Sequence, residues 1–320
     1  MALELGAVGP TVWRAIDRLS QEGQAARLFD LLDGAPDRAM VDAVLEHLDT
    51  DGTYRRLLRG DRVDLVVVEQ LVRLVGVAIA PMLLEAAEEC SDAKARERLY
   101  DLVASFGAKA VSPTARRLAE ATQGGGRAVP QRELIVLLGR LLTPEMPLPP
   151  EIDLRRFLRH DDAPVRREAV KLLIRSAKRD EAILAGLADS DGRIVYLALT
   201  AANERCPREG ISLIRGRVER GELDSSLRAL GIRAVATVRT PDTLRWLIDR
   251  ATTRSALLRR RKLLPTTPET LAAISAICSA WRQDPEAQEV IGLATKSRIP
   301  EVRNAGCGAR DVGRVQRGAA

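Results

Sequence analysis

The chain has 320 residues, of which 46% are apolar and only 3% are aromatic. A core with so few aromatic residues must be built from Leu, Val, Ile and Ala, which favours helix-on-helix packing over a β-sheet. The net charge of +6 is unevenly spread, because residues 1–160 carry 21 Lys and Arg against 24 Asp and Glu, whereas residues 161–320 carry 29 against 20. We therefore expect an all-α protein with a basic C-terminal half.

The N-terminal half begins without the basic and apolar regions of a secretory signal peptide. Its most apolar stretch, residues 63–84, contains Glu69, Arg73 and Pro81, so we expect one or two buried helices there and no membrane span. None of the chain's cysteines lies in a CxxC pair or near a histidine at ligand spacing; they are Cys90, Cys206, Cys278 and Cys307. This pattern predicts free, mostly buried thiols in a cytoplasmic protein.

Two segments interrupt the apolar periodicity near the middle of the chain. Residues 121–130 contain three consecutive glycines and predict a loop, and residues 143–150 contain four prolines and are not expected to be helical throughout. A helix is expected between them at 131–142. We interpret residues 1–307 as a single array with a hinge at 121–151, followed by a disordered tail at 308–320.

A short pattern recurs before several apolar helical runs: Asp, two residues, an apolar residue, Arg, two residues, and usually a small residue. It occurs at 92–99, 162–169, 191–198, 224–231 and 299–306, with the Asp kept in four copies and the Arg in four. The apolar positions are 70, 29, 33 and 75 residues apart. The period is therefore about 30 to 37 residues, which indicates a repeat array.

Each position of the pattern has a physical reason. The Asp lies where a helix N-cap accepts hydrogen bonds from the amides of the first turn. The small residue, such as Ala169, lets a neighbouring helix approach closely. A shorter apolar segment precedes the Asp, at 154–160 in one copy and at 181–189 in the next. Each copy therefore predicts two antiparallel helices, and such hairpins must stack to bury their apolar faces.

The pattern resembles the HEAT repeat, including its short bacterial form known as the PBS-lyase HEAT-like repeat. The resemblance implies an α-solenoid of stacked antiparallel helical hairpins, an armadillo-type superhelix. It also implies a ladder between adjacent repeats, formed by the turn aspartates and by the arginines one helical turn later. The ladder positions are Asp92, Arg96, Asp162, Arg166, Asp191, Asp224, Arg228 and Arg303. Val195 and Ile299 depart from the pattern, so the ladder is expected to break there.

His160, Asp161 and Asp162 form the one cluster that suggests metal or catalytic chemistry. The only other histidine is His47, in an apolar context, so we interpret the cluster as the end of one helix and the cap of the next. No phosphate-binding, dinucleotide-binding, zinc-protease or nucleophile-elbow motif is present, and Cys206 and Cys278 are expected to be structural thiols. We expect no catalytic residue, no cofactor and no metal.

Basic residues carry the remaining functional signal. In HEAT-like arrays the second helix of each hairpin usually lines the concave surface, which would place residues of 165–177, 194–205 and 227–238 in a common groove. A basic run lies at 253–265, and no aromatic residues are interleaved in it to stack on bases. The predicted partner-binding residues are Arg167, Lys171, Arg175, Arg233, Arg259, Arg260, Arg261 and Lys262.

These observations favour a non-catalytic scaffold or regulatory adaptor that binds an acidic segment of another protein. The alternative is a nucleic-acid-binding protein that uses the basic C-terminal half.

Overall fold

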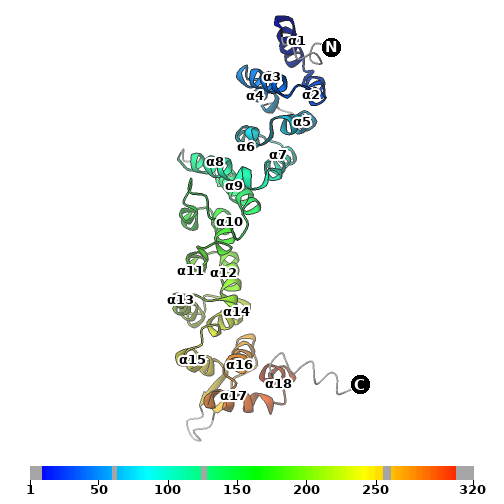
Figure 1. The fold of residues 1–320 in the computed structure, drawn as a ribbon. Coiled ribbons are helices and arrows are strands. Elements are labelled where there is room, and N and C mark those ends of the chain that lie inside the picture. Colours follow the sequence, from blue (N-terminus) through cyan, green and yellow to red (C-terminus); the bar gives the residue numbers. More distant parts are fainter. Residues whose placement is uncertain (1–8, 60–62, 124–127, 255–260, 308–320) are drawn as a thin grey trace, which may run out of the picture. The chain divides into compact units, whose positions relative to one another are not determined.

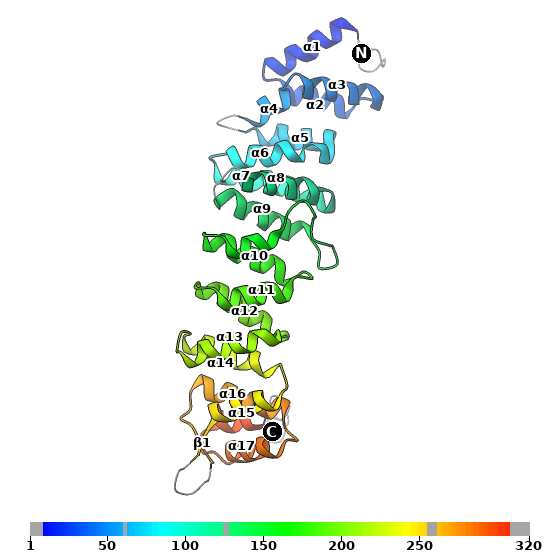
Figure 2. The same ribbon diagram turned by 90° about the vertical axis from the view of Figure 1, so that its left-hand side faces the viewer.

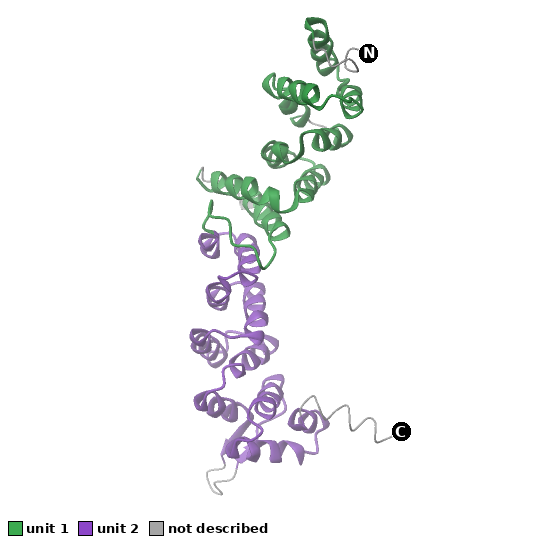
Figure 3. Ribbon diagram, in the orientation of Figure 1, with its two compact units in different colours: residues 1–153 green, residues 154–320 purple. Residues whose placement is uncertain are grey.

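The computed structural model describes residues 9–59, 63–123, 128–254 and 261–307. In these ranges it contains 18 α-helices, three short 3-10 helices and one two-stranded sheet (Figure 1). The prediction of an all-α protein is confirmed at this level. The chain divides into two compact units, Met1–Asp153 and Leu154–Ala320 (Figure 3). The predicted tail at 308–320 lies outside the described residues.

In the first unit, α-helices pack in two rows. Helices α2, α5, α7 and α9 contact one another in turn, and so do α4, α6 and α8. The core between them is aliphatic, with Leu71, Leu83 and Leu99 fully buried. The helices are α1 (Pro10–Gln21), α2 (Ala25–Asp33), α3 (Arg38–Thr50), α4 (Thr53–Leu58), α5 (Leu65–Val75), η2 (Gly76–Ile79), α6 (Ala80–Glu89), α7 (Ala93–Ser105), η3 (Gly107–Ala110), α8 (Val111–Gln123) and α9 (Ala128–Leu141).

The most apolar segment forms two helices. By length and composition alone, residues 65–89 pass as a membrane-spanning helix. In the structure α5 ends at Val75, its C-cap Gly76 has a φ of +70° that suits glycine, and η2 leads into α6. A bilayer-spanning helix needs about 20 residues, whereas α5 has 11 and α6 has 10.

The two interruptions have different outcomes. Helix α8 continues to Gln123 and α9 already begins at Ala128, so the helical part of 121–130 is larger than the glycines predicted, and residues 124–127 lie outside the description. Residues 142–151 contain no helix, as the prolines predicted. The boundary between the two units follows this segment, after Asp153.

In the second unit, helical hairpins follow one another along the chain (Figure 2). The second helices α10, α12, α14, α16 and α18 contact one another in turn, and α11 packs against α13. The elements are η4 (Leu154–Arg159), α10 (Ala163–Ile174), α11 (Arg179–Ala188), α12 (Gly192–Glu204), α13 (Arg208–Glu219), α14 (Ser225–Ala236), α15 (Pro241–Ala251), β1 (Thr252–Arg254), β2 (Arg261–Leu263), α16 (Pro268–Ala280), α17 (Pro285–Thr295) and α18 (Pro300–Cys307). The segment expected to be helical at 154–160 is a single 3-10 stretch, a form common in short connecting pieces.

The aspartates of the repeat pattern are helix N-caps, which confirms that part of the prediction. The side chains of Asp92, Asp162, Asp191 and Asp224 accept hydrogen bonds from backbone N–H groups in the first turns of α7, α10, α12 and α14. Asp37, Asp64 and Asp284 cap α3, α5 and α17 in the same way.

The small residue seven positions after the cap is explained by close helix approach. A Cβ built on Gly186 of α11 would lie 2.8 Å from the Cβ of Ala198 in α12, and one built on Gly231 of α14 would lie 2.9 Å from Ile214 Cγ2 in α13. The backbone of α11 at Gly186 therefore lies directly against the Ala198 side chain, and that of α14 at Gly231 lies against the Ile214 side chain. A larger residue at either glycine would force the two helices apart.

Helix propensity alone would make Gly186→Ala stabilising, whereas the close approach at Gly186 predicts that it is destabilising. Gly186→Ala should lower the free energy of unfolding by about 1–3 kcal/mol, because the added methyl overpacks the α11–α12 contact. The control is Gly292→Ala in α17, where a Cβ meets nothing within 4 Å, and it should raise stability by about 0.5–1 kcal/mol. Urea unfolding followed by circular dichroism measures both; equal stabilisation of the two variants would contradict the close approach.

Candidate functional site

The arginine of the repeat pattern forms hydrogen bonds to the turn that precedes its own helix. Arg166 of α10 donates from Nη1 to the carbonyl oxygens of His160 at 2.8 Å and Asp161 at 2.9 Å. Its Nε and Nη2 form a bidentate pair with Asp189, at 2.8 and 3.0 Å. Asp189 lies in the turn that precedes α12, so Arg166 joins two successive hairpins.

The other repeat arginines repeat this bonding to the turn. Nη1 of Arg96, Arg228 and Arg303 donates to a carbonyl oxygen five or six residues earlier, on Cys90, Leu223 and Ser297 respectively, at 2.8 to 2.9 Å. Their carboxylate partners are not the capping aspartates of the expected ladder. Arg96 pairs with Glu133 at 3.4 Å and Arg228 with Glu269 at 2.7 Å. The capping aspartates direct their oxygens at backbone amides of the helices that they cap, whereas Glu133 and Glu269 lie within α9 and α16.

The position where Val195 replaces the arginine is filled from another helix. Arg217 of α13 donates from Nη1 to the carbonyl oxygens of Leu187 at 2.7 Å and Asp189 at 2.9 Å. Asp189 lies six residues before Val195, the same separation as between His160 and Arg166. A guanidinium from the next hairpin therefore bonds the turn carbonyls at the repeat that has no arginine of its own.

The second helices present equivalent positions to solvent. Counted from the capping aspartate, the third, seventh and eleventh residues of α10, α12 and α14 face the interior, whereas the second, fifth and ninth mostly face outward. Because these helices pack in sequence, their outward positions share one face. We call this the basic face; it comprises Arg167, Lys171, Arg175, Arg193, Tyr196, Thr200 and Arg233.

Charge on the basic face is partly neutralised within α10. Glu168, whose side chain is mostly buried, pairs with Lys171 at 3.0 Å and with Arg167 at 3.2 Å. Arg193 and Arg233 are exposed, and no ion pair among the described residues involves either of them. Arg175 is exposed at the C-terminal end of α10. The basic face therefore remains positive, and its exposed arginines outside these ion pairs, Arg193 and Arg233, lie on α12 and α14.

An exposed aromatic residue lies on this face and was not among the predicted binding residues. Tyr196 of α12 is 54% exposed and occupies the fifth position after its cap, the position of Arg167 in α10. A large exposed ring is a common anchor in protein interfaces. Its signal in the sequence is that Tyr196 falls outside the apolar stripe formed by Ile194, Ala198 and Ala202.

The described ends of the basic run at 253–265 belong to a two-stranded sheet and lie outside the second helices that carry the basic face. Strands β1 and β2 pair in antiparallel register, with Thr253 opposite Lys262. The Arg261 side chain is only 8% exposed and pairs with Glu286 and Glu289, so this predicted binding residue is already engaged within the fold. Lys262 is exposed, and the predicted residues Arg259 and Arg260 lie outside the described residues.

His160 and Cys206, which were considered for metal or catalytic chemistry, make their contacts within the fold. His160 Nδ1 accepts the backbone N–H of Asp162 at 3.0 Å, and its ring stacks on Phe157. Burial raises the pKa of the Cys206 thiol to about 11, with Asp180 adding to the effect, so this thiol is protonated at neutral pH and a poor nucleophile. Among the described residues, no group of three or more His, Cys, Asp or Glu side chains is placed to hold a metal ion.

No protein-family model, curated protein or solved structure compared with the chain matches it.

The Arg166–Asp189 pair predicts a pH-dependent loss of stability. Burial alone would raise the pKa of Asp189, but hydrogen bonds from Arg166 and from the Asp191 backbone N–H outweigh it and lower this pKa. The stabilisation is therefore present above the ordinary carboxyl pKa of about 4 and is lost as the pH falls through the lowered value. Asp189→Asn should cost about 1.5–3 kcal/mol at pH 7, and this difference should shrink in acid. Asp161→Asn, with the same charge change on an exposed side chain, is the control; a difference that persists undiminished at acidic pH would refute the assignment.

Arg217 bonds the turn carbonyls at the repeat where Val195 replaces the arginine, so we expect positions 217 and 195 to be energetically coupled. Arg217→Met should lower the free energy of unfolding by about 1–3 kcal/mol, because two turn carbonyls lose a charged donor. Val195→Arg should restore a donor at the repeat position and recover part of that loss in the double variant. A double-mutant cycle by urea unfolding measures the coupling, and strictly additive effects would show that the two positions do not share these carbonyls.

Proposed function

We propose that the chain is a non-catalytic interaction scaffold, a HEAT-like α-solenoid that binds an acidic segment of a partner protein on its basic face. Capped second helices, arginines bonded to the preceding turns and successive packing of α10, α12 and α14 support the repeat assignment. Repeats of this kind create extended surfaces suited to a linear ligand.

One observation carries the binding proposal. Arg167, Lys171, Arg193 and Arg233 project from the outward positions of three packed helices, with Glu168 as their carboxylate neighbour and Tyr196 exposed among them. A surface of one sign attracts a ligand of the opposite sign and raises the rate of encounter. The exposed ring then supplies apolar contact area that charge alone does not.

The same ring favours a second candidate function, the binding of single-stranded nucleic acid. Proteins that bind single strands combine a basic surface with aromatic side chains on which bases stack. Tyr196 supplies the aromatic residue that is absent from the basic run at 253–265.

Charge reversal on the basic face tests the proposal. The double variant Arg193→Glu/Arg233→Glu should weaken binding of a fluorescein-labelled, glutamate-rich peptide by roughly tenfold or more at low ionic strength. The control Arg208→Glu/Arg298→Glu makes the same charge change at exposed residues outside the second helices, and should leave the affinity within about twofold. Equal weakening by both variants, measured by fluorescence anisotropy, would show a net-charge effect and contradict the site.

A labelled oligothymidylate distinguishes the second candidate. If the face binds single strands, Tyr196→Ala should weaken oligothymidylate binding by about 1–3 kcal/mol, the contribution of one stacked base. If it binds acidic protein segments, the peptide should bind more tightly than the oligonucleotide at physiological salt, and the oligonucleotide should show no dependence on Tyr196.

A further inference from the structure

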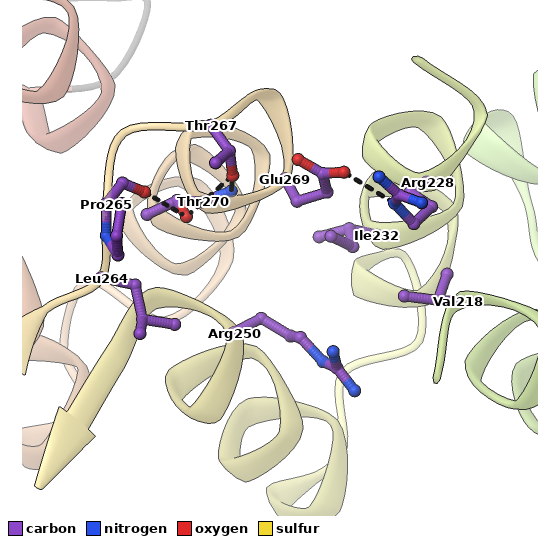
Figure 4. A pocket seen from close by; sticks show the side chains of 9 residues that line it. All are labelled: Val218, Arg228, Ile232, Arg250, Leu264, Pro265, Thr267, Glu269 and Thr270. Atoms are coloured by element: carbon purple, nitrogen blue, oxygen red, sulfur yellow. Dashed lines mark hydrogen bonds and ion pairs between the residues drawn. The ribbon is translucent and has the colours of Figure 1, made fainter. Parts of the chain in front are cut away.

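The long connection between α15 and α16 in the second unit contributes Leu264, Pro265 and Thr267 to the lining of a pocket. Three residues separate α11 from α12, whereas sixteen separate α15 from α16 and include strands β1 and β2. Beside this connection lies the pocket, of about 340 Å³, between α13, α14, α15 and the start of α16 (Figure 4). Its volume is at the lower end of the range for small-molecule sites, about 300–1,000 Å³.

The pocket has an apolar wall and two cationic groups. Val218, Ile232 and Leu264 supply the wall, and Figure 4 shows Arg250 across the pocket from the Arg228–Glu269 ion pair. Arg228 is already engaged, because Glu269 and the Leu223 carbonyl bind its guanidinium. Arg250 is therefore the lining cation with the most donor capacity left for a ligand.

Arg250 is held in place by Trp246 and Glu219. Its guanidinium lies over the Trp246 ring, 5.4 Å from the centroid, and Nη2 is 3.3 Å from Glu219 Oε1. The same oxygen accepts the Trp246 indole N–H at 2.9 Å. Glu219 is about half exposed, so its attraction for Arg250 is screened by solvent. Aromatic packing thus orients a guanidinium at the pocket without using up its donors.

We propose that this pocket binds a single carboxylate carried on a short aliphatic body. The carboxylate would accept hydrogen bonds from Arg250, and the aliphatic part would lie against Val218, Ile232 and Leu264. A second anionic group would meet Glu269, so the ligand carries one negative charge. Two kinds of ligand have this chemistry. One is a free aliphatic acid, and the other is the C-terminal residue of a protein chain, where that residue has an aliphatic side chain. The proposal is independent of the basic face, which lies on other residues.

Titration of the full-length chain with hexanoate and with N-acetyl-leucine tests the proposal. The amide N-acetyl-leucinamide is the matched neutral probe. Binding is followed by the ¹H–¹⁵N signal of the Trp246 indole, which shares Glu219 with Arg250; the indoles of Trp13 and Trp281 serve as internal references. The variants are Arg250→Met, which keeps an aliphatic side chain, and Arg245→Met, an exposed arginine on the same helix that does not line the pocket.

We expect at least one of the two acids to shift the Trp246 signal saturably, and the amide to bind about tenfold more weakly or not at all. Arg250→Met should weaken binding of that acid by about tenfold or more, whereas Arg245→Met should leave it within about twofold. Tighter binding of hexanoate identifies a free acid as the source, and tighter binding of N-acetyl-leucine identifies a chain terminus. No saturable shift with either acid, equal binding of the amide, or unchanged affinity in folded Arg250→Met would overturn the proposal.

Discussion

The hydrogen bonds between an arginine guanidinium and the carbonyl oxygens of a hairpin turn are the interaction on which the second unit depends. A tight turn between antiparallel helices leaves carbonyls that no helical N–H can reach. Arg166 and Arg228 satisfy them from the following helix, and Arg217 does so where Val195 cannot. A buried carbonyl without a donor costs about 1–3 kcal/mol. Each turn therefore needs a guanidinium donor, but that donor can come from more than one position in the sequence.

This view explains which parts of the fold could be predicted from the sequence. Caps, small residues and outward positions depend on neighbours within one hairpin, so the pattern around Asp162 or Asp224 defines them locally. The carboxylate partners depend on packing between hairpins. Glu133, Asp189 and Glu269 lie 37, 23 and 41 residues after their arginines, and no fixed spacing identifies them. The burial of Arg261 likewise depends on α17, which lies more than twenty residues further along the chain.

The candidate site was predictable in part for the same reason. Lys171 and Arg233 occupy the ninth position after their caps, so the repeat register alone places them on one face. Tyr196 occupies an outward position in the helix between them, yet it is distant from both in sequence. A search for aromatic residues interleaved with basic ones along the chain cannot find it, because the interleaving occurs across packed helices. The relevant neighbours of a repeat residue are those one period away.

The surface of the second unit differs from one hairpin to the next where the sequence departs from the repeat pattern. At α12 the arginine is lost, the turn is served by Arg217, and the outward position that holds Arg167 in α10 holds Tyr196. At α16 the short turn is replaced by sixteen residues, the cap is Thr267, and the carboxylate that meets Arg228 comes from the first turn of the helix. A pocket lies beside that pair. A repeat arginine that bonds its turn carbonyls has those donors engaged, whereas no hydrogen bond to a turn carbonyl is found for Arg193, Arg233 or Arg250 in the described part of the chain. The side chains on which the two proposals rest are therefore ones that no turn requires.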